Sequence, residues 1–350
     1  MTLLHKLGTQ WPLIQAPMAG VQGSALAIAV SNAGGLGSLP CAMLSVEALR
    51  AELQRIQAGT KAPYNVNFFC HRQPTPNESA ERRWRTALSP YYKEYGIDPA
   101  SIAVGAGRQP FNEEMAELLE EFKPPVVSFH FGLPESSLLQ RVKRWGATVM
   151  SSATTVEEAR WLEARGADVI IAQGLEAGGH RGMFLNNDLS AQVGTFALLP
   201  QVIAAVRVPV VAAGGIADKA GVRAALALGA QGVQIGTAYL LCPETSTSAV
   251  HRAALGSPAA EHTALTNVFS GRPARGIVNR LMRDFGCISA EPPEFPLATA
   301  ALVPLRTAAE QQGLGDFSPL WAGQNTRGCA AIPAAELTQR LVQAFNEKAN

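Results

Sequence analysis

The sequence has almost no net charge and no long uninterrupted apolar run. Its formal charge is +1 over 350 residues, which excludes the broad basic surface that nucleic acids or anionic membranes require. No run approaches the roughly 18 apolar residues of a membrane span. The N-terminal residues also lack the layout of a secretory signal peptide. We therefore expect a cytoplasmic protein that binds neither nucleic acid nor membrane, and we expect a monomer or a homodimer.

The residue spacings of metal sites, disulfide frameworks and serine hydrolases are also missing. The five cysteines are scattered and odd in number, and no CxxC pair occurs, so we expect reduced, buried thiols. No HxxxH, HxE or carboxylate cluster predicts a metal site, and we expect none. No GxSxG motif predicts a serine nucleophile. With 47% apolar residues, the chain can form a sizeable core.

The first 245 residues alternate strand-like and helix-like segments. Eight short apolar runs end in glycine, proline or polar residues, as expected of strands buried on both faces. They lie at residues 11–18, 34–40, 64–70, 125–131, 147–152, 168–174, 208–215 and 232–241. Between them lie segments with helical apolar spacing; Ser45 is a plausible N-cap, and Thr155 with Glu158 fits a capping box. The alternation predicts an α/β fold, and the count of eight favours a (β/α)8 TIM barrel over an open doubly wound sheet.

Two stretches depart from this alternation. Residues 71–107 contain four prolines and predict a long irregular segment, which is typical of a lid or binding element. Residues 246–315 also lack the pattern. We interpret residues 1–70 and 108–245 as the barrel, the two departing stretches as cap or lid segments, and residues 316–350 as a C-terminal tail that packs on the barrel.

Neutral amides and glycine-rich turns follow several predicted strands at one rim, where TIM-barrel active sites lie. Backbone N–H groups in such turns can hold a phosphate without lysine or arginine. Side-chain amides suit a flat ring edge that carries both carbonyls and N–H groups. One phosphate and one polar ring describe flavin mononucleotide (FMN). The residues that support this prediction are Asn67, Gln173, Gly214, Gly215, Gln234, Gly236 and Thr237.

The stretch "GLEAGGHRG", residues 174–182, places His180 among four glycines. Its imidazole would hydrogen-bond or exchange a proton with a bound substrate, unless it only pins the loop. Glu176 is expected to orient this loop by accepting backbone N–H bonds. His130, between aromatic residues, is either a pocket residue or a buried core histidine. His71 is interpreted as a surface residue, and His251 has no supporting context.

Several motifs together resemble class I nitronate monooxygenases, formerly called 2-nitropropane dioxygenases. They are "QAPMAG" (15–20), "SNAGGLGSL" (31–39), "NVNFFCH" (65–71), "SFHFG" (128–132), "AQGLEAGGHRG" (172–182), "VVAAGGI" (210–216), "GVQIGTAYLLCPE" (232–244) and "DFSPLWAGQ" (316–324). The turn "EAGGH" alone is shared with FMN-dependent enoyl-ACP reductases and some NADH:quinone reductases. "QAPM" combined with "SFHFG", "IGTA" and "WAGQ" is more specific.

This resemblance implies a barrel with a small cap, non-covalent FMN, and oxidation of alkyl nitronates by O2 to carbonyl compounds and nitrite. It implies that His180 is catalytic and that His130 binds substrate. The FMN site that it implies comprises Met18, Asn67, Gln173, Gly178, Gly215, Gln234, Ile235, Gly236 and Thr237. The alternative function is an NAD(P)H-dependent flavin oxidoreductase of the related quinone reductase or enoyl-ACP reductase type. A non-catalytic, phosphate-binding barrel is the third possibility.

The chain departs from the family pattern at the substrate wall. Where the family carries two tyrosines and a lysine, this chain has Phe295, Thr299 and Val303, and a further tyrosine position falls near Ala106. The more apolar wall predicts a preference for neutral-tailed alkyl nitronates over the carboxylate-bearing propionate 3-nitronate. We also predict that Gly178→Val empties the flavin site, because the branched side chain would occupy the cofactor's volume or demand a forbidden turn conformation.

Overall fold

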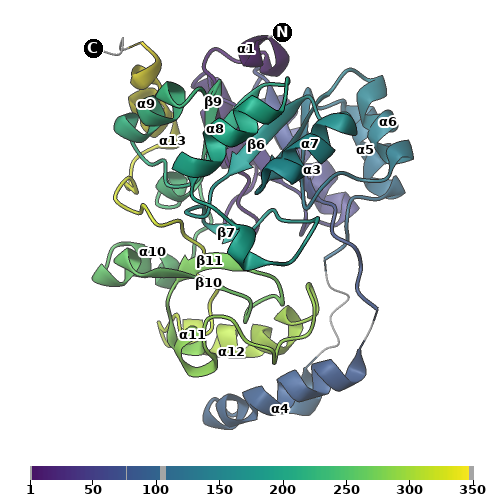
Figure 1. Ribbon diagram of the computed structural model, residues 1–350. Coiled ribbons are helices and arrows are strands. Elements are labelled where there is room, and N and C mark those ends of the chain that lie inside the picture. Colours follow the sequence, from purple (N-terminus) through teal and green to yellow (C-terminus); the bar gives the residue numbers. More distant parts are fainter. Residues whose placement is uncertain (1, 76, 103–107, 347–350) are drawn as a thin grey trace.

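The main sheet closes into a barrel. The computed structural model describes residues 2–75, 77–102 and 108–346, and its largest sheet has eight parallel strands in the order β1-β9-β8-β6-β5-β4-β3-β2. A parallel bridge between Ile14 and Leu36 joins the two ends. The predicted (β/α)8 barrel and its eight strands are therefore confirmed (Figure 1). The strands are β1 (Leu13–Gln15), β2 (Gly37–Pro40), β3 (Tyr64–Phe69), β4 (Val126–His130), β5 (Thr148–Ala153), β6 (Val169–Gln173), β8 (Val210–Ala213) and β9 (Gly232–Ile235).

Helices follow the barrel strands and cover their outer face (Figure 1). Ser45 caps α3 as predicted, because its hydroxyl accepts the N–H of Ala48. Thr155 caps α7 in the same way, but the Glu158 carboxylate accepts from Thr154 instead of closing a capping box. The helices are α2 (Ser24–Asn32), α3 (Val46–Gly59), α5 (Glu113–Phe122), α6 (Ser136–Arg144), α7 (Val156–Ala164), α8 (Thr195–Ala205), α9 (Lys219–Ala227) and the C-terminal α13 (Ala334–Val342).

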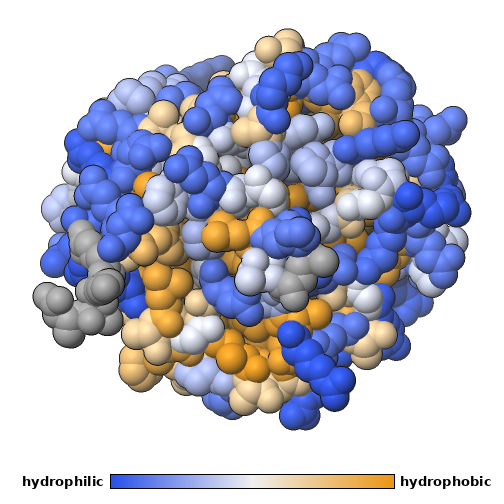
Figure 2. Space-filling model, turned by 90° about the horizontal axis from the view of Figure 1, so that it is seen from above, coloured by the Kyte–Doolittle hydropathy of each residue, from blue (hydrophilic) through white to orange (hydrophobic). Residues whose placement is uncertain are grey.

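The N-terminal end of the barrel is filled and closed. Leu3 and Leu7 of α1 (Leu3–Leu7) pack onto Ile14, Val169 and other inward-facing strand residues. Figure 2 views this end, where hydrophilic residues predominate and hydrophobic ones are interspersed among them. The space for a ligand is therefore left at the opposite end, where the strands finish. Among the described residues, no helix has both the length and the apolarity to cross a bilayer.

A second layer lies beyond the C-terminal ends of the strands (Figure 1). It contains a three-stranded antiparallel sheet in the order β10-β11-β7. The strand β7 (Gly179–His180) belongs to the loop after β6, so this sheet carries His180 from the barrel into the second layer. The other elements are β10 (Thr263–Thr266), β11 (Ala274–Ile277), α4 (Glu78–Glu94), α10 (Ala249–Leu255), α11 (Arg280–Phe285), α12 (Thr299–Gln311) and the 3-10 helices η1 (Pro99–Ser101), η2 (Leu189–Ala191), η3 (Thr237–Tyr239), η4 (Pro258–Glu261) and η5 (Gln343–Phe345).

The prediction of an irregular stretch at residues 71–107 is wrong for its middle part. Residues 78–94 form α4, which has Pro90 within it. Trp84, Leu88 and Tyr92 recur every four residues and are buried in one cluster with α12. The Trp84 Nε1 and the Tyr92 hydroxyl donate to backbone carbonyls next to and within α12. This burial outweighs the local cost of proline in a helix.

Candidate active site

A cavity opens where the barrel strands end, beneath the second layer. The predicted residues that line it are Met18, Asn67, His130, Gln173, Gly178, His180, Gly214, Gly215, Gln234, Gly236 and Thr237. Ile235 does not line it, because successive strand residues point to opposite faces and its side chain packs into the core between barrel and helices. Residues predicted at the C-terminal ends of the strands thus lie around one cavity, although they come from segments more than 200 positions apart in the sequence.

His180 presents a neutral imidazole to this cavity. Its Nε2 lies 2.9 Å from the Ser270 hydroxyl oxygen. Burial lowers the pKa of His180 well below its ordinary value, and the nearby Arg108 guanidinium lowers it further. The ring is therefore uncharged at neutral pH. Its Nδ1 has no hydrogen-bond partner in the part of the chain that the structure describes.

The loop that carries His180 is held by Arg181, its buried neighbour. The Arg181 guanidinium donates to the carbonyl oxygens of Gln173 and Gly174, at 2.8 and 2.7 Å. The Gln173 side-chain amide donates to the His180 carbonyl and accepts from the Gly182 N–H. The backbone is thus fixed without the His180 ring, which weakens the alternative that His180 only pins the loop.

His130 supports the same loop from the barrel. Its Nε2 donates to the His180 carbonyl oxygen at 3.1 Å, and its Nδ1 lies 3.1 Å from the Ser152 hydroxyl, which donates to it. Burial lowers the pKa of His130 to about 4. His130 therefore lines the cavity as a neutral ring with both nitrogens engaged, and it combines features of the pocket and core interpretations.

Two histidines lie differently from expectation. His71 is buried, not on the surface, because its Nε2 donates to the Arg108 carbonyl and its ring packs on Phe295. His251 of α10 lines the cavity, and its buried Nε2 has no partner among the described residues. No local pattern distinguished His251, because α10 enters the site only through tertiary packing.

Unsatisfied polar groups mark where a ligand would fit. The Gln234 Oε1 is buried and has no hydrogen-bond partner among the described residues. The backbone N–H groups of Gly215 and Gly236 likewise have none within that part of the chain. Buried polar atoms are normally paired, so the Gln234 Oε1, together with these two N–H groups of cavity-lining glycines, is available to a bound molecule. The N-terminus of α9 is not part of this set, because Asp218 already caps it.

The glycine turn contains two glycines with different constraints. A Cβ on Gly178 would lie 2.5 Å from the Gly323 nitrogen, and Gly178 does not have a positive φ. We predicted that a side chain at Gly178 would enter the cofactor's volume or demand a forbidden turn conformation, and this reason is wrong. A Cβ at this position would instead collide with the backbone of the "WAGQ" segment. Gly179 has a φ of 71°, and a Cβ there would meet no atom within 4 Å, so it borders open cavity. The Glu176 carboxylate orients the loop as expected, by accepting from the Thr195 N–H and hydroxyl.

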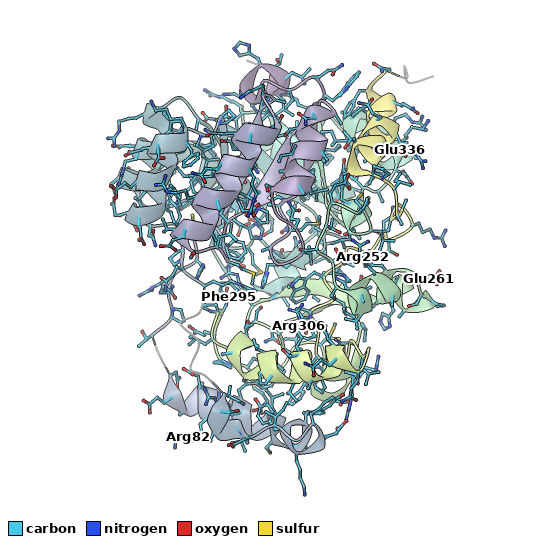
Figure 3. All side chains as sticks on the ribbon, turned by 180° about the vertical axis from the view of Figure 1, so that it is seen from behind. Arg82, Arg252, Glu261, Phe295, Arg306 and Glu336 are labelled. Atoms are coloured by element: carbon cyan, nitrogen blue, oxygen red, sulfur yellow. The ribbon has the colours of Figure 1, made fainter. Side chains whose placement is uncertain are left out.

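None of the described residues predicted for the substrate wall lines the cavity directly, and only Phe295 packs against a residue that does. Phe295 lies between the barrel and the second layer (Figure 3), with its ring centre 5.3 Å from that of His180. The Thr299 hydroxyl instead donates to the Phe269 carbonyl, and Val303 is 52% exposed on α12. Ala106 lies outside the described residues. Arg108 also lines the cavity, although no motif in the sequence marks it.

Comparison with known proteins identifies the family. The profile of the family described as "Nitronate monooxygenase" matches residues 1–344. A nitronate monooxygenase of Pseudomonas aeruginosa is 45% identical over 340 residues, which cover 96% of this chain and 97% of the relative. The chain belongs to the nitronate monooxygenase family. A nitronate monooxygenase of Paraburkholderia phytofirmans is 43% identical, covering 97% of this chain and 93% of its own.

One solved structure agrees with this family assignment, and a second shares the fold. A nitroalkane oxidase from Streptomyces ansochromogenes has a TM-score of 0.88 at 37% identity and covers 99% of both chains. FabK from Thermotoga maritima has a TM-score of 0.70 at 25% identity, covering 98% of this chain and 95% of its own. The resemblance carried by the sequence motifs is thereby confirmed.

Proposed function

We propose that this chain is an FMN-dependent nitronate monooxygenase, which oxidises alkyl nitronates with O2 to carbonyl compounds and nitrite. One observation carries the proposal: the neutral His180 faces a cavity whose described lining residues include no carboxylate. Such a cavity suits an anionic substrate and a phosphate-bearing cofactor. Family membership supports this reaction and does not support the NAD(P)H-dependent alternative or a non-catalytic barrel.

FMN fits the unsatisfied groups of the cavity. The N–H groups of Gly215 and Gly236 would hold its phosphate, and the Gln234 Oε1 would accept a ring N–H. Met18 and Asn67 would line the same site, with Gly178 and Thr237 shaping it. Bound FMN supplies electron transfer between the nitronate and O2.

The residues around His180 favour binding of an anion. A nitronate is already deprotonated at carbon, so no strong base is required. The single proton of the Ser270 hydroxyl is shared between the His180 Nε2, at 2.9 Å, and the Arg272 carbonyl oxygen, at 3.2 Å. In the tautomer in which the hydroxyl donates to Nε2, the ring proton of His180 lies on Nδ1. This N–H would donate to a nitronate oxygen and hold the substrate in place. His130 positions the His180 backbone and borders the substrate pocket.

We further propose that residues 71–107 and 246–315 act as the cap of this site. The packing of α4 on α12, and the pairing of β7 with β11, support a layer that excludes water from His180. The cytoplasmic location and the monomeric or homodimeric state stay predictions from the sequence.

Spectroscopy of the purified protein tests the proposal. We expect a yellow protein whose heat-released cofactor co-elutes with FMN. Anaerobic addition of propyl-2-nitronate should bleach the flavin, and air should restore its colour with release of nitrite. A colourless protein, or one bleached rapidly by NADH but not by nitronates, would overturn the proposal.

The role of His180 is tested by His180→Ala. We expect retained FMN and fold, but about 100-fold slower flavin reduction by nitronate, the scale of a removed acid–base or charge-stabilising group. His262→Ala is the matched control, because His262 is exposed and lies outside the cavity. Reduction of the His180→Ala flavin at the parent rate would show that the imidazole only pins the loop.

A further inference from the structure

Arg108 contributes a cation without an anionic partner. Its Nη1 is buried and has no hydrogen-bond partner in the described residues, where no carboxylate forms an ion pair with it. Burial lowers the pKa of its guanidinium, and no neighbouring acid offsets this shift. Arg108 as a whole is half-buried, and its Nη2 reaches the Met43 sulfur at 4.0 Å. A cation whose buried N–H groups lack an acceptor is costly unless an anion satisfies them. The site therefore favours a ligand that brings a negative charge.

The position of Arg108 separates the inner cavity from the protein surface. The residue lines the active-site cavity and also an outer groove formed by residues 42–47 and 109–115. Its Cζ lies 5.5 Å from the centre of the Phe295 ring, which also packs against His180. Its backbone is fixed because the Arg108 carbonyl accepts from the side chains of His71 and Gln73, each at 3.0 Å. Arg108 and His180 thus flank one aromatic ring, with Arg108 at the outer end.

The other guanidinium near these rings, that of Arg272, is partly engaged, although its buried Nε also has no hydrogen-bond partner among the described residues. The Arg272 Cζ stacks 4.0 Å from the centre of the Phe131 ring, and its Nη2 donates to the Met183 carbonyl. Arg272 is also absent from the cavity lining, whereas Arg108 is part of it. Arg108 is therefore the guanidinium, among the described residues, that a substrate in the cavity would meet.

We propose that Arg108 determines specificity by binding a carboxylate on the alkyl tail of the substrate, while the nitronate group lies beside His180. This assignment rests on the proposed function. It reverses the preference for neutral-tailed nitronates that we expect from the sequence. That expectation rests on a missing lysine at Val303, which is exposed, and it leaves Arg108 out of account. A planar guanidinium can pair with a carboxylate through two parallel hydrogen bonds, and its stacking on Phe295 would orient it.

The test compares propionate 3-nitronate with propyl-1-nitronate, which lacks the carboxylate. The parent enzyme should prefer propionate 3-nitronate in kcat/KM. Arg108→Met should lower kcat/KM for that substrate about 10- to 100-fold, mainly through KM, the scale of hydrogen bonds to a charged group. Its kcat/KM for propyl-1-nitronate should fall much less, because that substrate brings no carboxylate to the guanidinium, so the selectivity for propionate 3-nitronate should be lost. Arg82→Met is the matched control, because Arg82 is exposed on α4, far from the cavity (Figure 3).

A binding measurement gives a second readout. Propionate, an unreactive carboxylate, should perturb the flavin spectrum of the parent and of Arg82→Met, but not of Arg108→Met at the same concentration. A parent preference for propyl-1-nitronate, or unchanged selectivity in Arg108→Met, would overturn the assignment. If neither nitronate bleached the parent flavin, the proposed function itself would fail. Bleaching by both without an effect of Arg108→Met would refute only the role of Arg108.

Discussion

Substitution of Gly178 by alanine tests how the glycine turn is packed. The added Cβ would lie 2.5 Å from the Gly323 nitrogen and 2.6 Å from the Ala322 carbonyl carbon, about 1 Å inside ordinary contact. The opposing backbone cannot easily retreat, because the Gly323 N–H donates to Thr237 and the Gln324 N–H donates to Glu176. We expect a loss of about 3 kcal/mol in folding free energy, and a lower Tm by roughly 5 °C.

Gly179→Ala is the matched comparison. Its Cβ meets no protein atom within 4 Å, so the cost for folding is the positive φ, about 1–2 kcal/mol. This Cβ would project into the cavity. For each kcal/mol of lost folding free energy, the affinity for FMN should therefore fall more in Gly179→Ala than in Gly178→Ala. Thermal unfolding of the apoproteins and FMN titration by fluorescence measure both quantities. An unchanged Tm for Gly178→Ala would refute the packing argument, and unchanged FMN affinity for Gly179→Ala would refute its placement against the cofactor.

Two further predictions concern stability. Burial lowers the pKa of His130 and His251 to about 4, and it also lowers the pKa of His71 and His180. Below about pH 6.5 the unfolded chain therefore binds protons that the folded chain does not. Stability should fall between pH 6.5 and 4, and His130 and His251 alone contribute about 2–3 kcal/mol per pH unit. A Tm that stays constant from pH 7 to 5 would contradict this. Glu158→Ala leaves the N–H groups of Thr154 and Phe184 unpaired and should cost about 2–4 kcal/mol, while the exposed Glu157→Ala should unfold like the parent in a denaturant titration.

The barrel could be predicted from the sequence because its determinants are local. Each strand is a short apolar run with a clear end, and Ser45 and Thr155 mark helix starts by their own side-chain bonds. Parallel strands in a barrel finish at one rim, so the pattern alone places Asn67, Gln173 and Gln234 around one cavity. The cofactor prediction and the choice of His180 followed from that rule and the glycine-rich turn.

Only the tertiary structure decided the charges and contacts within the site. Pro90 hid the helix α4, because its stability comes from burial against α12, which lies some 200 positions away in the sequence. His71 is buried, and His251 reaches the cavity from a helix with no motif. Among the described residues, the Arg108 Nη1 has no hydrogen-bond partner, and only the folded arrangement of its neighbours shows this. Pairing and desolvation depend on groups brought together by folding, and no local pattern of residues encodes them.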